Sequence, residues 1–142
     1  MFDIKTDRGT VHFSKRTVRQ ICISAVDSCE GKAVIYNFKG KGRNKGEAVF
    51  QPRNEKAVAA DIEIEGDGDE LMITLYVVIR FGASIKGTAE KIINSIFHQL
   101  KEAFDVTPQK VVVINTGTAS KDVIARRMEF IRTAGSKEVI MI

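Results

Sequence analysis

Cysteine is scarce in this chain of 142 residues, which contains only Cys22 and Cys29. Their numbers differ by seven within a segment of helical periodicity, and two helical turns separate the Cα atoms by roughly 10 Å. A disulfide needs a Cα separation below about 7 Å, so a bridge between them is excluded. No CxxC pair and no Cys/His spacing typical of zinc is present. We therefore expect two reduced thiols, as in a cytosolic protein.

Long apolar runs are also missing. No run approaches the ~20 residues that a membrane-spanning helix requires. The N-terminus, MFDIKTDRGT, is polar and leads directly into the predicted domain, so we expect no signal peptide. The length corresponds to about one domain. These features predict a single cytoplasmic domain over residues 1–142, with any membrane contact peripheral or through a partner.

A nucleotide-binding signature is absent, although residues 79–91, IRFGASIKGTAEK, place a glycine turn between a predicted strand and a predicted helix. Gly82 and Gly87 have the separation of a Walker loop, but Thr88 stands where that loop requires lysine. The GxGxxG pattern is missing, and the preceding strand is predicted to be the second arm of a hairpin. We interpret the segment as a tight corner in which Ser84 caps the next helix.

Catalytic and metal-binding constellations are likewise missing. Residues 66–70, GDGDE, lack the twelve-residue register and the later bidentate glutamate of a calcium loop, which favours a solvated turn over a metal site. His98 has no HExxH partner, and no Ser/His/Asp or Cys/His set is visible. We therefore expect no catalytic residue, no cofactor and no metal, and a protein that is not an enzyme.

Hydrophobic periodicity predicts two helices and a hairpin. Residues 15–30 and 85–103 carry apolar side chains at helical spacing, and Ser14 suits the N-cap of the first helix. Residues 57–65 and 71–79 alternate between apolar and polar side chains on either side of a Gly/Asp turn. This alternation is typical of a β-hairpin.

The remaining segments complete the predicted fold. Residues 10–14 and 111–115 read as short strands, residues 120–134 as a third helix, and the tail KEVIMI either adds a strand or docks on a neighbour. The order β-α-β-β-α-β plus a C-terminal helix predicts an α+β two-layer sandwich. In it, helices cover one face of a small sheet that is largely antiparallel or mixed. A ferredoxin-like core fits this order, but the strand order stays open.

A basic insert spans about residues 33–56 and contains the run KGKGRNKG. Its ends favour either a hairpin with a glycine-rich tip or a mobile loop. The cations of the run are a candidate anion-binding loop for the phosphates of nucleic acid or anionic lipid, against the alternative of a solvated loop. They are Lys39, Lys41, Arg43 and Lys45.

One face of the second hairpin strand is too apolar for open water, because it carries Met72, Tyr76 and Val78. Something is expected to cover it. We therefore interpret these three side chains as a candidate interaction face, either for a partner or for a second copy of the chain.

Two long segments resemble the bacterial alkaline shock protein family, also called the Gls24-type or envelope stress response family. They are RGTVHFSKRTVRQICISAVDSCEG and ADIEIEGDGDELMITLYVVIRFGASIKGTAEKIINSIFHQLKEAFDVTPQKVVVINTGT. The shared pattern is an opening strand and helix, an alternating strand, an acidic glycine turn, a strand ending in Tyr-Gly (here Phe81-Gly82), a long helix and a valine-rich strand. The resemblance covers about residues 8–119. The basic insert is longer than is usual in the family, and Lys86 and Gly87 replace its frequent proline.

The resemblance implies a small, non-enzymatic cytoplasmic protein linked to cell-envelope stress. Members of that family are commonly held at the membrane by a membrane-anchored partner and tend to self-associate. The first hypothesis is therefore a scaffold or interaction protein. The second is a protein that binds nucleic acid or anionic lipid through the basic loop, and the third is an enzyme with a cleft near His98 or the acidic turn.

Overall fold

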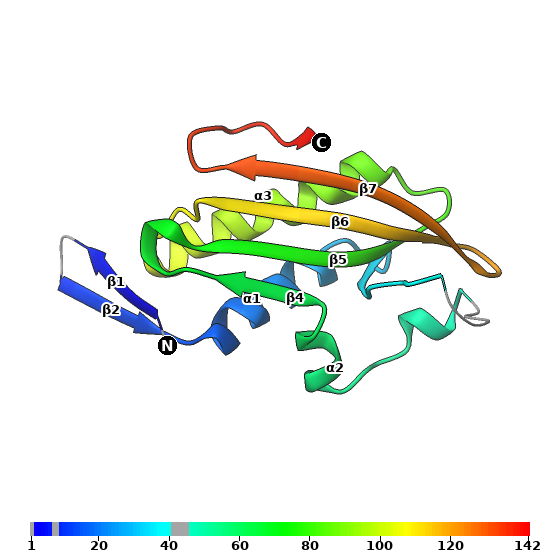
Figure 1. Ribbon diagram of the computed structural model, residues 1–142, viewed down its shortest axis with the longest axis horizontal. Helices are drawn as coiled ribbons and strands as arrows, with labels where there is room; N and C mark the ends of the chain where they lie inside the picture. Colours follow the sequence, from blue (N-terminus) through cyan, green and yellow to red (C-terminus); the bar gives the residue numbers. More distant parts are fainter. Residues whose placement is uncertain (1, 7–8, 41–45) are drawn as a thin grey trace.

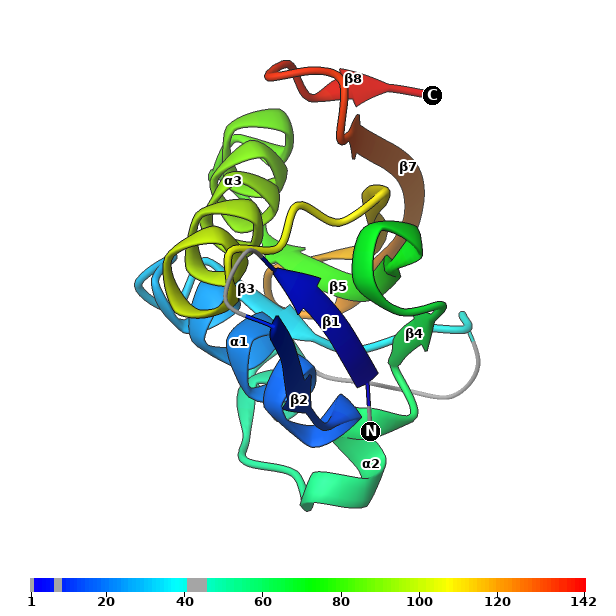
Figure 2. The same cartoon turned by 90° about the vertical axis from the view of Figure 1, so that its left-hand side faces the viewer.

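The structure of the protein, a computed structural model, describes residues 2–6, 9–40 and 46–142. A six-stranded mixed sheet has two long helices, α1 (Lys15–Asp27) and α3 (Ile85–Phe104), on one face (Figures 1 and 2). The predicted α+β class is confirmed. The strands of this sheet are β3 (Ala33–Ile35), β4 (Ile62–Glu65), β5 (Met72–Arg80), β6 (Lys110–Ala119), β7 (Val123–Thr133) and β8 (Ile140–Met141). A separate antiparallel hairpin, β1 (Phe2–Thr6) and β2 (Gly9–Phe13), precedes α1.

Strand β5 organises the sheet. One edge of β5 pairs antiparallel with β4 through Met72–Leu75 and with β3 through residues 77–79, so β3 and β4 follow each other along that edge. The predicted hairpin is thereby confirmed. The other edge of β5 pairs parallel with β6, and α3 connects the two strands. β5 is therefore both the second arm of the hairpin and a parallel strand, whereas the sequence indicated only the hairpin. β7 and β8 then extend the sheet antiparallel.

The main core lies between the two helices and the sheet. Alternate residues of β5 point into it and are fully buried, because successive strand residues face opposite sides of a sheet. The apolar stripe of α3 covers them, and α1 packs beside α3. Both predicted N-caps are confirmed, since Ser14 Oγ accepts from Thr17 N and Ser84 Oγ accepts from Gly87 N. The buried stripe of α3 comprises Ala89, Ile92, Ile93, Ile96, Phe97 and Leu100.

The predicted helix at 120–134 is wrong, because β7 occupies residues 123–133. β7 pairs with β6 along nearly its whole length, and this pairing overrides a helix-like spacing of apolar residues. Val123 and Phe130 are seven residues apart, so the alternation of side chains along a strand places them on opposite faces of the sheet. Val123 packs on the face away from the helices, while Phe130 packs in the main core. The tail adds a strand, β8, which was one of the two predicted alternatives.

The described residues of the basic insert do not pair with each other as a hairpin. Ala33–Ile35 pairs with β5, and Ala48–Phe50 is a short 3₁₀ helix. Phe38, which follows the strand, and Val49 of the 3₁₀ helix pack against the far end of the sheet in a second, smaller core cluster. The expected strand from residue 57 also starts later than predicted. Helix α2 (Glu55–Ala59) comes first, capped by Asn54 Oδ1, which accepts from Ala57 N at 2.8 Å.

Candidate functional site

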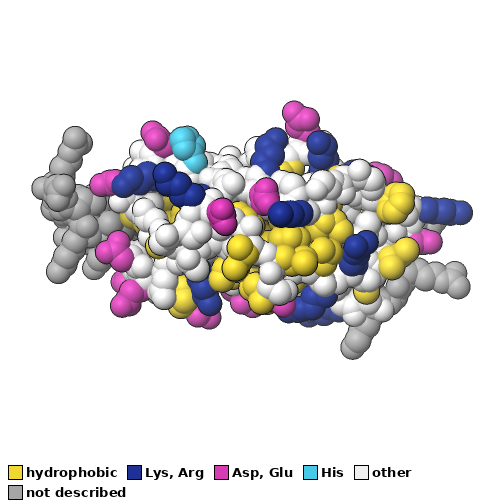
Figure 3. Space-filling view, turned by 90° about the horizontal axis from the view of Figure 1, so that it is seen from above, with side chains coloured by type: hydrophobic (Ala, Val, Ile, Leu, Met, Phe, Trp, Pro, Cys, Tyr) yellow, Lys and Arg dark blue, Asp and Glu magenta, His cyan; other side chains and the backbone are white. Residues whose placement is uncertain are grey.

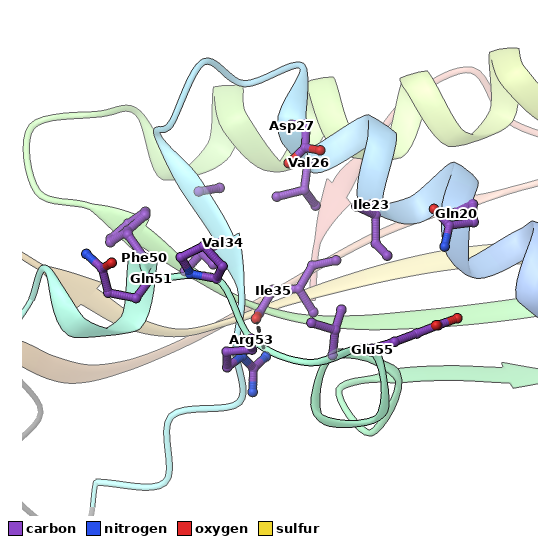
Figure 4. A pocket seen from close by; sticks show the side chains of 13 residues that line it. Gln20, Ile23, Val26, Asp27, Val34, Ile35, Phe50, Gln51, Arg53 and Glu55 are labelled. Carbon is purple, nitrogen blue, oxygen red and sulfur yellow. Dashed lines mark hydrogen bonds between the residues drawn. The ribbon is translucent and has the colours of Figure 1, made fainter.

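A groove of about 410 Å³ lies where α1, β3 and the segment from Phe50 to Val58 meet (Figure 4). Its volume falls within the range of about 300–1,000 Å³ that is usual for ligand pockets. The lining is mostly apolar, with a few polar side chains at the rim. The residues that line it are Gln20, Ile23, Val26, Asp27, Ala33, Val34, Ile35, Phe50, Gln51, Pro52, Arg53, Glu55 and Val58.

The floor of the groove is the exposed margin of the main core. Val26 and Ile35 are 3% and 5% exposed, and both belong to that core. Ile23 and Val58 are half-buried and pack against the same core from α1 and α2. In Figure 4, Ile23 and Val26 point from α1 toward Ile35 on β3. An apolar side chain placed between them would be removed from water, which favours binding by about 25 cal/mol per Å² of apolar surface.

The outer edge of β3 supplies backbone groups to this groove. Tyr36 N donates to Tyr76 O and Arg80 N donates to Lys32 O. The backbone N–H and C=O groups of the even-numbered residues therefore point toward β5. The alternation of an antiparallel ladder then directs the N–H groups of Ala33 and Ile35 away from β5. No other strand of the described chain pairs with this edge. Such an edge is a template for pairing with an extended segment.

Arg53 closes one end of the edge. Its Nη2 donates to the carbonyl oxygen of Ile35 and to Asp61 Oδ2, the latter at 2.9 Å. The guanidinium also lies over the ring of Tyr36, 4.7 Å from its centroid. Asp61 Oδ2 accepts a further bond from Asn37 N at 3.2 Å. Arg53 thus joins the segment after Phe50 to β3 and to the residue before β4. It occupies the outward carbonyl oxygen of Ile35 and leaves the outward N–H groups of Ala33 and Ile35 unpaired.

The aromatic wall of the groove is held from the opposite side. Arg80 stacks on the ring of Phe50 at 3.7 Å. Its Nε donates to Gly31 O and its Nη1 to Glu47 Oε1, both at 2.8 Å. The hydrogen bond and the charge of Arg80 lower the pKa of Glu47 from its ordinary value. Through Arg80, these contacts hold the segment from Glu47 to Phe50 in one position relative to Gly31 and the start of β3.

Chemically, the groove offers apolar contact and backbone hydrogen bonds. The thiols are set apart from it. Cys22 and Cys29 are free and buried, as expected, and burial raises the pKa of Cys22 to about 12. Since the thiolate is the reactive form, a thiol with this pKa is inert at neutral pH. The geometry therefore supports binding at the groove.

The predicted interaction face lies on the opposite side of the sheet from the helices. Met72 and Tyr76 are half-buried there, and the Tyr76 hydroxyl donates to Glu63 Oε1 at 3.0 Å. Burial is the main cause that raises the pKa of Tyr76. Val78 is fully buried beneath Phe38 and its neighbours in the second core cluster, so this chain covers it itself. A role of Met72 and Tyr76 in contacts with a partner stays a prediction.

The candidate anion-binding loop falls largely outside the described residues, which exclude Lys41, Arg43 and Lys45. Lys39 is exposed and lines a hollow of about 280 Å³ together with Arg126 and Arg127 of β7. Sequence reasoning missed these two arginines because it assigned them to a helix. The strand pairing that brings them to Lys39 leaves no local signal in the sequence.

The other positions weighed from the sequence lie apart from the groove. The acidic turn contains a short 3₁₀ helix, Gly68–Glu70, whose carboxylates are exposed. His98 is exposed on α3. At the glycine corner, Gly82 has a φ of 93°, a conformation that suits glycine and lets the chain turn from β5 into the capped start of α3.

The fold is a two-layer α+β domain with a groove beside an unpaired edge strand. The chain belongs to the alkaline shock protein 23 family, a family with a cell envelope-related function, whose sequence model matches residues 3–118. This match confirms the resemblance to the alkaline shock, or Gls24-type, proteins. A comparison with curated proteins found no match, and neither did one with solved structures. In the described part of the chain, none of the helices has the length and apolar character needed to cross a membrane.

Proposed function

We propose that the protein serves its envelope-related function as a non-enzymatic interaction protein that holds an extended segment of a partner protein in the β3 groove. Such a segment would pair with the outward N–H groups of Ala33 and Ile35 and place one apolar side chain between Ile23 and Val26. A membrane-anchored partner, a cytoplasmic location beside the membrane and self-association belong to the same proposal, on the basis of the family resemblance.

The unpaired backbone of β3 beside an apolar floor is the observation that carries this proposal. In a strand that adds to a sheet edge, main-chain bonds provide affinity and pockets for alternate side chains provide specificity. The groove combines both features within three strand residues. The rim carries charges of both signs, because Asp27 and Glu55 are acidic and Arg53 is basic. Glu55 is already paired with Arg16, so the apolar floor and the backbone edge, rather than net charge, decide the partner segment.

Two substitutions test the groove. Ala33→Pro removes an outward N–H without removing a bond to β5, and proline is tolerated on edge strands. Ile23→Lys places a charge in the groove wall, and Ser24→Lys, at an exposed position of the same helix, is its control. We expect both groove variants to lose the proteins that the tagged wild-type chain and the control capture from cells. Capture of the same proteins by all variants would contradict the proposal.

A second candidate function is anion binding through the basic loop, because Lys39 lies beside Arg126 and Arg127. Replacing Lys39, Lys41, Arg43 and Lys45 with alanine tests it by binding to duplex DNA at several salt concentrations. Each lost phosphate contact should flatten the slope of log affinity against log salt by about 0.9. No measurable binding of the wild type at low salt would end this candidate.

A further inference from the structure

Three arginines of the described chain stack on aromatic rings, and they differ in one respect. Arg53 lies over Tyr36 and Arg80 over Phe50, and each also pairs with a carboxylate. Arg132 lies over Phe97, 4.0 Å from its centroid, but no Asp or Glu of the described chain forms an ion pair with it. A partly buried charge is usually balanced by an opposite charge. Within the described residues, Arg132 therefore lacks the counter-ion that the other two possess.

Arg132 is nevertheless held in a fixed orientation. Its Nε donates to the carbonyl oxygen of Ser136 and its Nη1 donates to Asn94 Oδ1, each at 3.0 Å. The ring of Phe97 covers one face of the guanidinium. Burial lowers the pKa of Arg132 from its ordinary value, which reflects the cost of holding this charge away from water. Among the described residues no hydrogen bond of Nη2 is found, and a guanidinium nitrogen is a strong donor to phosphate oxygens.

The space beside Arg132 is a pocket of about 490 Å³ between α3 and the turn from β7 to β8. Its ten lining residues include Arg132, Lys101, Lys137 and His98 but no Asp or Glu. Of the cations, Lys101 is partly neutralised by Asp105. Lys137 is exposed and forms no ion pair within the described chain. The charge of the walls therefore favours an anion over a cation in this pocket.

An apolar segment adjoins this pocket. The turn that contributes Ser136 and Lys137 to the pocket leads directly into Ile140, Met141 and Ile142, which are 58%, 60% and 71% exposed. They are three of the five large hydrophobic side chains that are exposed in the described chain. Figure 3, which views the molecule from above, shows hydrophobic side chains gathered toward the middle of this face, with both basic and acidic side chains around them.

We propose that this face binds the surface of an anionic membrane. The pocket around Arg132 takes the phosphate of a lipid headgroup. The outer edge of the sheet at β8 enters the apolar boundary beside it, with Met141, which pairs with Phe130, on the helix side and Ile140 and Ile142 on the other side. A cationic pocket beside an apolar tail identifies a lipid surface as the partner. A free phosphate would contact only the cations, and an apolar protein surface would contact only the tail. The part of this face from Arg132 to Ile142 lies beyond the residues that match the family model, and the pocket shares no lining residue with the β3 groove.

Flotation of the full chain with vesicles tests the proposal. We expect the protein to float with vesicles of phosphatidylcholine mixed with phosphatidylglycerol, more weakly at high salt, and not with phosphatidylcholine alone. Each cation near an anionic surface contributes about fivefold to binding. The double variant Lys101→Gln/Lys137→Gln should therefore bind about 5-fold to 25-fold more weakly, since Asp105 already neutralises part of the charge of Lys101. The control variant Lys32→Gln/Lys56→Gln removes two exposed cations elsewhere, so it has the same net charge but should bind more tightly than the first.

The apolar contribution has its own matched pair. Ile140→Ser/Ile142→Ser should weaken vesicle binding about tenfold, since each buried methylene contributes to membrane affinity. Phe81→Ser/Ile124→Ser removes two side chains of similar exposure that belong neither to the pocket nor to the tail, and should leave binding unchanged. Thermal unfolding of every variant verifies its fold. Arg132→Gln is a secondary test, because Arg132 also contacts Phe97 and Asn94.

Three results would each contradict the proposal. One is a wild-type chain that stays with the unbound fraction for both kinds of vesicle at low salt. Another is a loss of binding that is equal in the face variants and in their controls, which would show that net charge or general apolar exposure is responsible. Binding that survives in Lys101→Gln/Lys137→Gln would likewise contradict the role of the pocket.

Discussion

Arg53 and Asp61 form an ion pair, with Nη2 2.9 Å from Oδ2, that joins the start of β4 to the segment lining the groove. Their side chains are 24% and 15% exposed. The same Asp61 oxygen accepts from Asn37 N, and the same Arg53 nitrogen donates to the carbonyl oxygen of Ile35. The pair therefore holds the groove at the junction of three segments that are distant in sequence.

Removing one member of this pair should destabilise the protein. Arg53→Gln leaves Asp61 partly buried without its counter-ion, and we expect a loss of about 1–2 kcal/mol in the free energy of unfolding. Arg16→Gln breaks the exposed pair with Glu55 and should cost less than about 0.5 kcal/mol. Urea unfolding of both variants measures the difference. Equal effects would mean that the pair at the groove has no structural role.

Glycine at position 46 should be required for docking of the insert. A Cβ added there would lie 1.8 Å from the backbone oxygen of Ser120, whereas one added at Gly135 would meet nothing within 4 Å. We expect Gly46→Ala to lower the free energy of unfolding by about 2 kcal/mol or more, since the backbone must move. Gly135→Ala should be neutral within about 0.5 kcal/mol. Thermal or urea unfolding distinguishes the two.

The assignment of residues 123–133 to a strand makes a specific prediction. Phe130 is 1% exposed in the main core, and Ile124 is 66% exposed. Phe130→Ala should therefore cost about 3–5 kcal/mol in stability, and Ile124→Ala less than about 0.5 kcal/mol. In a helix over residues 120–134, as the sequence indicated, Ile124 would lie on the apolar side and Phe130 would not. A large effect at Ile124 with a small one at Phe130 in urea unfolding would restore the helix.

The buried thiols should make stability depend on pH in the alkaline range. Burial raises the pKa of Cys22 from 9.0 to about 12 and raises that of Cys29 as well. The unfolded chain then loses protons at a lower pH than the folded chain. Stability is full below pH 9 and falls as the pH rises from about 9 toward 12, by up to about 1.4 kcal/mol per pH unit for one thiol.

Urea unfolding between pH 8 and pH 11 measures this slope. Cys22→Ala should flatten it, whatever the variant costs in stability at neutral pH through the cavity it leaves. Only the slope of stability against pH is compared between the wild type and Cys22→Ala, so a constant loss of stability from the cavity does not affect the result. An unchanged slope in Cys22→Ala would show that this thiol titrates normally in the folded chain.

Local patterns in the sequence predicted the elements whose own residues decide their structure. The apolar stripe and Ser84 cap of α3, and the alternation of β4 and β5, needed no knowledge of distant contacts. β7 depended on pairing with β6, and its apolar residues imitate helical spacing because Val123 packs on one face of the sheet and Phe130 on the other. The segment at Phe38 depended on docking against β5 and β7.

The candidate site was not predictable for the same reason. The groove joins α1, β3 and the segment at Arg53, and three consecutive strand residues such as Ala33–Ile35 carry no sign of which edge stays unpaired. The pocket at Arg132 requires a turn between two strands, and the sequence indicated a helix there. In both cases the tertiary arrangement brings together side chains whose spacing along the chain has no regular pattern.

Site-specific photo-cross-linking in living cells tests the central claim most directly. A photoreactive residue replaces Gln51 at the groove rim, or Glu102 on the exposed side of α3 as a control. We expect a discrete cross-linked protein from position 51, none from position 102, and loss of the product when Ala33→Pro is combined with the probe. No product at position 51, or one that persists with Ala33→Pro, would contradict binding at the β3 edge.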